Sequence, residues 1–128
     1  MDIRGIGIDV VEVERMRRAL ARWGDPLTRR LFTADEVSRA GPEATRAIRL
    51  AARFAAKEAV MKALGLGWPT MAWHEIEILN DDAGRPTVGL RGGAARAAHL
   101  QGVSDVLISL THTAHLAAAS AIALGNPP

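Results

Sequence analysis

Apolar positions follow two different periods along this chain, and the change from one to the other separates strands from helices. A β-branched run with two glycines over 3–10 predicts a strand whose glycines allow close backbone approach. From 11 to 23 the apolar positions recur every three or four residues, which predicts an amphipathic helix. The apolar stripe of that helix consists of Val13, Met16, Leu20 and Trp23. The chain therefore begins with a strand followed directly by a helix.

The longest predicted helix runs over 43–64, between Pro42 and Gly65, residue types typical of a helix start and a helix stop. Two shorter helical segments are predicted before it. Asp25 followed by Pro26 indicates a short turn, and the run from Thr33 to Glu36 has the form of a capping box. A face of small residues on the long helix suits close packing against a sheet: Ile48, Ala52, Ala55, Ala56, Ala59, Val60 and Ala63.

The second half of the chain reads mainly as strands. Alternating residues predict strands over 73–79 and 87–90, joined by the turn residues of 81–86, and an alanine-rich helix follows over 93–101. Two further strands are predicted over 106–111 and 116–124. Strands and helices without strict βαβ repetition predict an α+β fold: a mainly antiparallel sheet packed against one long and several short helices, in a single domain over 1–128.

Length and composition exclude several classes of protein. A chain of 128 residues with 48% hydrophobic residues is long enough for one folded core and too apolar for a disordered protein. No apolar run is long enough to span a bilayer, and the N-terminus lacks the pattern of a secretory signal. The chain has no cysteine, so disulfide and thiolate chemistry are excluded and a cytoplasmic location is expected.

Lysine is nearly absent. The chain has sixteen Lys and Arg residues, of which only Lys57 and Lys62 are lysine, and these two flank Glu58. An ammonium group is a compact charge that a planar guanidinium does not replace, so the pair suggests a site that handles phosphate and protons. The alternative is coincidence, with Glu58 and Lys62 forming an ordinary i,i+4 ion pair on the helix surface.

Two carboxylates are candidates for a metal site. Asp9 lies where the first strand gives way to a helix, and Glu58 lies on the long helix. Carboxylates from separate elements, with water and phosphate completing the shell, suit Mg²⁺, while the lack of cysteine disfavours zinc. The alternatives are a helix cap for Asp9 and a surface ion pair for Glu58.

Taken together and in order, four motifs resemble the holo-[acyl-carrier-protein] synthases, the small bacterial class of 4′-phosphopantetheinyl transferases. They are Gly5-Ile-Gly-Ile-Asp9 with Glu12 and Arg15, Leu31-Phe-Thr-Ala-Asp35-Glu36, Arg53-Phe-Ala-Ala-Lys57-Glu58 with Lys62 and Gly65, and Ile108-Ser109-Leu-Thr111-His112. Larger members carry a third metal-binding acid where this chain has Val11, so a water should take that coordination place. The resemblance covers essentially the whole chain.

The resemblance implies the fold of these transferases and an enzyme that moves 4′-phosphopantetheine from coenzyme A to a serine of apo acyl carrier protein. Asp9 and Glu58 would hold Mg²⁺, or Mn²⁺, and Lys62 would stabilise the leaving phosphate. Three candidates remain for the general base: Glu58, a metal-bound water and Asp35. The residues implied in coenzyme A binding are Arg53, Lys57, Lys62, Gly65, Gly67, Thr111 and His112.

The resemblance also implies partners. Arg15, Arg18 and Arg22 recur on one helix face and would bind the acidic carrier protein, although a solvated face with Glu14 pairing Arg18 explains Arg18 and Arg22 equally well. Small synthases assemble as homotrimers with active sites between subunits, and serve fatty-acid or polyketide synthesis. The alternative is a non-catalytic basic module that binds carrier protein or nucleic acid. An aromatic content of 4% without tyrosine argues against nucleic acid, and no membrane partner is expected.

Overall fold

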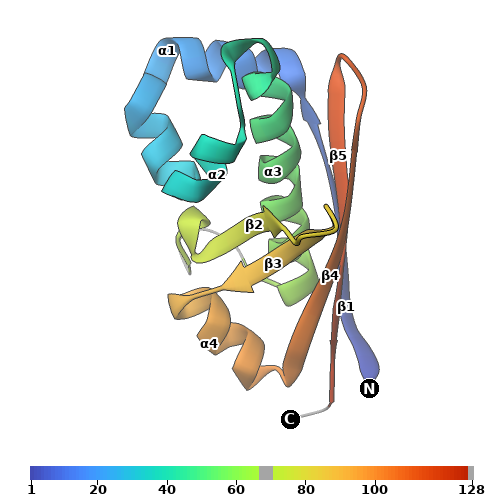
Figure 1. Cartoon of the computed structure of the whole chain (residues 1–128). Coiled ribbons are helices and arrows are strands. Elements are labelled where there is room, and N and C mark those ends of the chain that lie inside the picture. Colours follow the sequence, from blue (N-terminus) through green and yellow to red (C-terminus); the bar gives the residue numbers. More distant parts are fainter. Residues whose placement is uncertain (67–70, 127–128) are drawn as a thin grey trace.

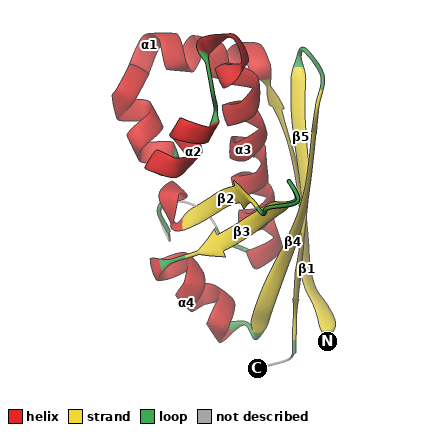
Figure 2. Ribbon diagram, viewed as in Figure 1, coloured by secondary structure: helices red, strands yellow, loops and turns green. Residues whose placement is uncertain are grey.

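The structure is a computed structural model that describes residues 1–66 and 71–126. Helices and strands are mixed, and the strands pair in antiparallel fashion, so the predicted α+β class is confirmed (Figures 1 and 2). The elements in chain order are β1 (Asp2–Glu12), α1 (Val13–Leu31), α2 (Ala34–Arg39), α3 (Glu43–Leu64), the 3₁₀ turn η1 (Trp73–Glu75), β2 (Ile76–Asn80), β3 (Pro86–Leu90), α4 (Gly92–Leu100), β4 (Val103–His112) and β5 (Leu116–Gly125).

The strands form two separate sheets. The larger has the order β1-β5-β4, so the first strand of the chain pairs with the last, and the smaller is the β2-β3 hairpin. The long helix α3 runs along one face of the larger sheet, as Figure 1 shows. Among the described residues no element covers the opposite face of that sheet. None of the described helices is long and apolar enough to cross a membrane.

Two glycines bring β1 into direct contact with α3. A Cβ atom added at Gly7 would lie 1.9 Å from the carbonyl oxygen of Ala59, and one added at Gly5 would lie 1.9 Å from that of Ala63. Only glycine fits at such distances, because no other residue lacks a Cβ. The small-residue face predicted for α3 supplies the other half of this contact, since Ala59 and Ala63 are buried in it. The close approach places Asp9, two residues after Gly7, beside the C-terminal half of α3.

The core has two parts that share α3. One part joins the C-terminal half of α3 to the larger sheet, the hairpin and α4, and includes Ile76 and Ile78. The other joins its N-terminal half to α1 and α2, and includes Val13, Phe32 and Leu50. Every segment that carries a candidate site residue therefore packs on this helix.

Two differences between the predicted and observed element boundaries have a clear structural origin. Val11 stays in β1, where it pairs with Ala117, so the helix begins at Val13 and then continues to Leu31 through a break at Gly24, which has a positive φ of 58°. The strand predicted from 73 begins only at Ile76. Its first three residues form η1, because the Glu75 carboxylate accepts hydrogen bonds from the backbone N–H groups of residues 72 and 93 and holds the chain in a turn.

Candidate active site

Asp9, Glu58 and Lys62 lie close together, as the motifs predict. Asp9 and Glu58 line one cavity, between the end of β1, the start of α1 and the middle of α3. The Lys62 ammonium donates to the carbonyl oxygen of Ile8 at 2.9 Å and lies 3.4 Å from an Asp9 carboxylate oxygen. Glu12 lines the same cavity, although the motif gave no reason to assign it a role. The remaining lining residues are Val10, Val11, Arg15, Met16, Ala19, Leu27, Leu31 and Phe54.

The electrostatics of this cavity favour a bound cation. Partial burial raises the pKa of Glu58, the nearby Asp9 carboxylate raises it further, and the positive charge of Lys62 opposes both effects. Two carboxylates that repel each other are stabilised by a divalent ion between them. No group of three or more His, Cys, Asp or Glu side chains suited to a metal occurs among the described residues, so solvent or substrate oxygens would complete the shell, as Mg²⁺ allows. The donor set therefore fits the predicted ion.

A second cavity holds Arg53 and His112, and its lining contains no carboxylate. Arg39 from α2 and Arg49 from α3 contribute two more guanidiniums, and Asn80 at the end of β2 accepts a hydrogen bond from Arg53 at 3.1 Å. Burial lowers the pKa of the Arg53 guanidinium, while the carboxylate of Glu36 opposes this shift. Neither Arg39 nor Arg49 belongs to a motif quoted above, and the only signal for them was the predominance of arginine among the basic residues. Such an arginine cluster suits a phosphate group.

The two cavities belong to opposite edges of the larger sheet. Asp9 lies on β1 and His112 on β4, and β5 separates these strands. Within one chain the carboxylate cluster and the arginine cluster therefore form separate sites, which the linear order of the motifs did not reveal.

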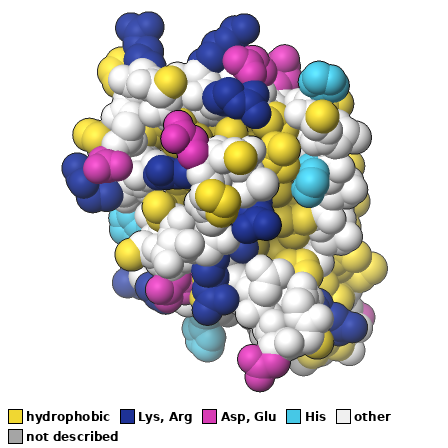
Figure 3. All heavy atoms as spheres, turned by 45° about the horizontal axis from the view of Figure 1, so that its top comes forward, with side chains coloured by type: hydrophobic (Ala, Val, Ile, Leu, Met, Phe, Trp, Pro, Cys, Tyr) yellow, Lys and Arg dark blue, Asp and Glu magenta, His cyan; other side chains and the backbone are white. Residues whose placement is uncertain are grey.

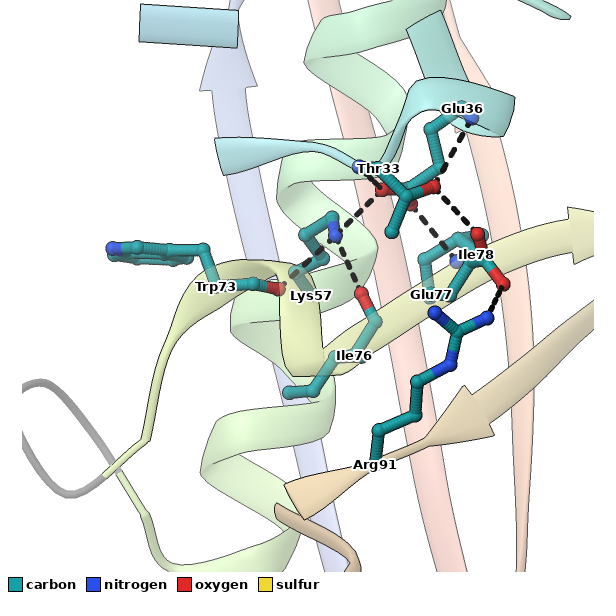
Figure 4. A network of polar contacts seen from close by, with 8 residues as sticks. All are labelled: Thr33, Glu36, Lys57, Trp73, Ile76, Glu77, Ile78 and Arg91. Carbon is teal, nitrogen blue, oxygen red and sulfur yellow. Dashed lines mark hydrogen bonds and ion pairs between the residues drawn. The ribbon is translucent and has the colours of Figure 1, made fainter. Parts of the chain in front are cut away.

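The placement of Lys57 does not agree with its predicted contact with coenzyme A. Its side chain is fully buried, and the ammonium lies 2.8 Å from a Glu36 oxygen while donating to the carbonyl oxygens of Trp73 and Ile76 (Figure 4). An ammonium has three protons, and these partners use all three. Burial lowers the pKa of Lys57, and the Glu36 carboxylate opposes this shift. Lys57 is therefore corrected from a cofactor-binding residue to a member of an internal ion pair.

The other residues predicted for catalysis or cofactor binding that the structure describes line neither cavity. Gly65 ends α3 in a left-handed conformation with φ 67° and has open space where a side chain would be, while Gly67 lies outside the described residues. Thr111 is exposed but lines neither cavity, because neighbouring residues of a strand point to opposite faces and His112 takes the inner one. Asp35 is exposed on α2 and also lines neither cavity.

The three arginines of α1 that were predicted to bind the carrier protein differ in their surroundings. Arg15 lines the cavity of Asp9 and Glu58. Arg18 lies 3.7 Å from Glu14, as the solvated-face interpretation expects, and Arg22 stacks 4.9 Å above the exposed ring of Trp23. Basic side chains are spread over this end of the molecule, with fewer acidic ones between them (Figure 3). The surface thus offers guanidiniums and an aromatic ring to an acidic partner.

Comparison with known proteins identifies the family of this chain. Residues 5–119 match the family model of the 4′-phosphopantetheinyl transferase superfamily. A holo-[acyl-carrier-protein] synthase of Desulforudis audaxviator is 48% identical over 96% of this chain and 94% of its own. A crystal structure of the Neisseria meningitidis synthase superposes with a TM-score of 0.86 at 31% identity, covering 96% of this chain and 99% of that one.

A third comparison concerns a ligand. A holo-(acyl-carrier-protein) synthase of Bacillus anthracis, solved in complex with CoA (3′,5′-ADP), superposes with a TM-score of 0.78 at 30% identity over 97% of this chain and 98% of that one. The family match covers most of the chain, and the relatives match it almost from end to end. The chain therefore belongs to the holo-[acyl-carrier-protein] synthase family of the 4′-phosphopantetheinyl transferase superfamily.

Proposed function

We propose that this protein transfers 4′-phosphopantetheine from coenzyme A to a serine of apo acyl carrier protein and releases adenosine 3′,5′-bisphosphate. The observation that carries the proposal is the pairing of two phosphate-directed clusters in a chain of this family. Asp9, Glu58 and Lys62 suit a pyrophosphate with a divalent ion, and the acid-free cavity of Arg53 and His112 suits a phosphate monoester. Coenzyme A carries both groups, separated by a ribose.

The reaction needs positioning and charge neutralisation more than covalent help. The serine oxygen bonds to the phosphorus that carries pantetheine, and the bond from that phosphorus to the bridging oxygen breaks, so the bridging oxygen leaves with the nucleotide. Mg²⁺ or Mn²⁺, held by Asp9 and Glu58, would supply charge neutralisation at the pyrophosphate. Lys62 stabilises the charge on the leaving oxygen. Of the two side chains considered for the serine proton, Glu58 lines this cavity and Asp35 does not.

We further propose a homotrimer in which neighbouring subunits complete each active site. The uncovered face of the larger sheet carries exposed apolar side chains, with Ile6 71% and Ile8 66% exposed. An apolar patch of this kind indicates a protein interface. Others on this sheet are Val10, Leu107 and Ile122. A cyclic assembly through that face brings the β1 edge of one subunit toward the β4 edge of the next, which would join the two cavities.

The composite site can be tested by mixing two inactive variants. Glu58→Gln removes a metal ligand, and Arg53→Glu reverses a charge in the other cavity. In randomly mixed cyclic assemblies, about a quarter of the interfaces combine two intact halves, so roughly a quarter of the activity should return. Mixtures that stay as inactive as each variant alone would contradict a site shared between subunits.

The acceptor is an acidic carrier protein that binds the basic face of α1, where Arg15 lies next to the carboxylate cavity. We place the reaction in the cytoplasm, in the supply of holo carrier protein to fatty-acid or polyketide synthesis. A non-catalytic basic module is not favoured, because it leaves the cluster of Asp9, Glu58 and Lys62 without a role.

The direct test is to follow the nucleotide product. With coenzyme A, Mg²⁺ and apo carrier protein, chromatography should detect adenosine 3′,5′-bisphosphate in proportion to carrier protein consumed. Failure to release it with several carrier proteins, by a protein shown to be folded, would overturn the proposal.

A further inference from the structure

The buried Lys57–Glu36 pair joins three segments that pack against one another: α3, α2 and the region of η1 and β2. Lys57 belongs to α3 and Glu36 to α2, and the Lys57 ammonium also donates to the carbonyl oxygens of Trp73 and Ile76, at the two sides of η1. The second Glu36 oxygen accepts the backbone N–H of Ile78 in β2 at 2.9 Å. One ion pair thus fixes α2 and the start of the hairpin onto the same helix (Figure 4).

The network extends outward from this pair. The Thr33 N–H donates to Glu36 at 2.8 Å, and the Thr33 hydroxyl donates to Glu77 on β2. Glu77 in turn accepts from Arg91 at 2.7 Å, beyond the end of β3. The described strands of the hairpin form no backbone hydrogen bonds with strands of the larger sheet. The polar contacts of the hairpin with the rest of the molecule are therefore largely the side-chain contacts of this network.

The segments held by this network form walls of the arginine cavity. Arg39 enters that cavity from α2, and Asn80 enters it from the end of β2, where its side-chain oxygen accepts from Arg53. Arg49 and Arg53 stand on α3 itself. The relative position of the guanidiniums therefore depends on how α2 and β2 pack on α3, and Lys57 and Glu36 contact all three elements from inside.

We propose that Lys57 and Glu36 are positioning residues for the arginine cavity, setting its affinity for a phosphate-bearing nucleotide without touching that ligand. This rests on the proposed function for the identity of the nucleotide. Neither Lys57 nor Glu36 lines the carboxylate cavity. Asp9 is on β1 and Glu58 is on α3, and the contact between these two elements is made by glycine, alanine and Lys62. Removing the Lys57–Glu36 pair should therefore raise the Kd for the nucleotide more than it lowers kcat.

The test uses Lys57→Met, a substitution of similar length without charge, with Arg96→Met at an exposed position of α4 as the matched control. Calorimetry with adenosine 3′,5′-bisphosphate should show a Kd raised roughly tenfold to hundredfold in Lys57→Met, the effect of misplacing binding groups by about 1 Å, and no change in the control. The KM for coenzyme A should rise by the same factor, and kcat at saturating coenzyme A should stay within about threefold.

A purely structural role gives a different pattern. Partial unfolding lowers the active fraction, so kcat falls while the Kd of the folded fraction and the KM stay as in the wild type. If Lys57→Met shows a lowered kcat with unchanged Kd and KM, the proposal is overturned. It is also overturned if both the Kd and the kcat of Lys57→Met equal those of the wild type. Wild-type protein that fails to bind the nucleotide at all would instead overturn the proposed function.

Lys57→Met leaves the buried Glu36 carboxylate unpaired and can fail to fold. Two further variants test the proposal if Lys57→Met does not fold. Glu36→Gln with Lys57→Met removes both charges together. Asn80→Ala removes the exposed hydrogen bond by which β2 holds Arg53, together with the hydrogen bond that the Asn80 amide donates to the Gly84 carbonyl oxygen. Both should raise the Kd for adenosine 3′,5′-bisphosphate by at least several-fold, and an unchanged Kd in Asn80→Ala would contradict the role given to the β2 wall.

Discussion

The Lys62 ammonium lies 3.4 Å from a carboxylate oxygen of Asp9, across the junction of α3 and β1. The side chain of Lys62 is 55% exposed, whereas that of Lys57, five residues earlier on the same helix, is fully buried. The two lysines of this chain therefore have different roles. Lys62 presents a charge to the candidate active site, and Lys57 holds the elements around it.

Lys62→Met should reduce turnover without unfolding the protein. We expect kcat to fall by a factor of about 10 to 1000, the range for loss of one charge-stabilising group, because Lys62 is the side chain assigned to the charge on the leaving oxygen. The exposed position should limit the change in the free energy of unfolding to about 0.5 kcal/mol. Steady-state kinetics and thermal unfolding measure the two effects, with Arg96→Met as control, and an unchanged kcat would remove Lys62 from the mechanism.

The raised pKa of Glu58 predicts an unusual pH dependence of stability. Between its ordinary value of 4.5 and the raised folded value, the folded protein binds more protons than the unfolded chain. The stabilisation from protonated Glu58 is therefore complete below pH 4.5 and is lost as pH rises through the folded pKa. Without divalent metal, Glu58→Gln should melt at a higher temperature than wild type at neutral pH, and this advantage should disappear toward pH 4.5.

Two controls accompany that melting series. Glu14→Gln, on the exposed face of α1, should give no comparable gain. Added Mg²⁺ should raise the melting temperature of wild type and leave Glu58→Gln unchanged, because one metal ligand is missing. If the difference in melting temperature between Glu58→Gln and wild type grows as pH falls, the predicted effect of the raised Glu58 pKa is contradicted.

Gly7→Ala should separate the strand from the helix and so disturb the metal site. The new methyl group would lie 1.9 Å from the Ala59 carbonyl oxygen, so β1 must move, at a cost of about 1–3 kcal/mol or more. Mg²⁺ affinity should fall with stability, because Asp9 moves away from Glu58. Gly89→Ala is the matched control in a strand, since its methyl group meets nothing closer than 3.9 Å. Equal Mg²⁺ affinity in both variants would show that the glycine contact does not position Asp9.

Arg15→Glu should weaken binding of the acidic carrier protein by at least about tenfold, with the loss decreasing at high salt, because a favourable charge pair becomes a repulsive one. Affinity for coenzyme A should change much less. Surface plasmon resonance with immobilised carrier protein and calorimetry with coenzyme A provide the comparison. Equal losses in both assays would count against a carrier-protein role for Arg15.

The fold was largely predictable because its signals are local. Pro42 and Gly65 bracket α3 as observed, and the Thr33–Glu36 capping box is present. The grouping of Asp9 with Glu58 also followed from the ordered motifs, together with a strand whose glycines permit close packing. These features depend on nearby residues or on a single strand–helix contact.

What the sequence could not show depends on packing between distant segments. Lys57 neighbours Glu58 in sequence, but its side chain points to a different side of the helix. It is buried because α2 and the start of β2 pack over that side. Glu36 has the sequence pattern of a capping-box residue, and this pattern does not indicate that the same carboxylate pairs with Lys57. The separation of His112 from Asp9 follows from the strand order β1-β5-β4, which no local pattern specifies.

Transfer of the phosphopantetheine group can be measured by intact-mass spectrometry of the carrier protein. Apo carrier protein incubated with coenzyme A, Mg²⁺ and this protein should gain the mass of one phosphopantetheine group on one serine. The same mixture with Glu58→Gln should leave it unmodified. An unmodified carrier protein with folded wild-type protein, or equal modification by Glu58→Gln, would contradict the account.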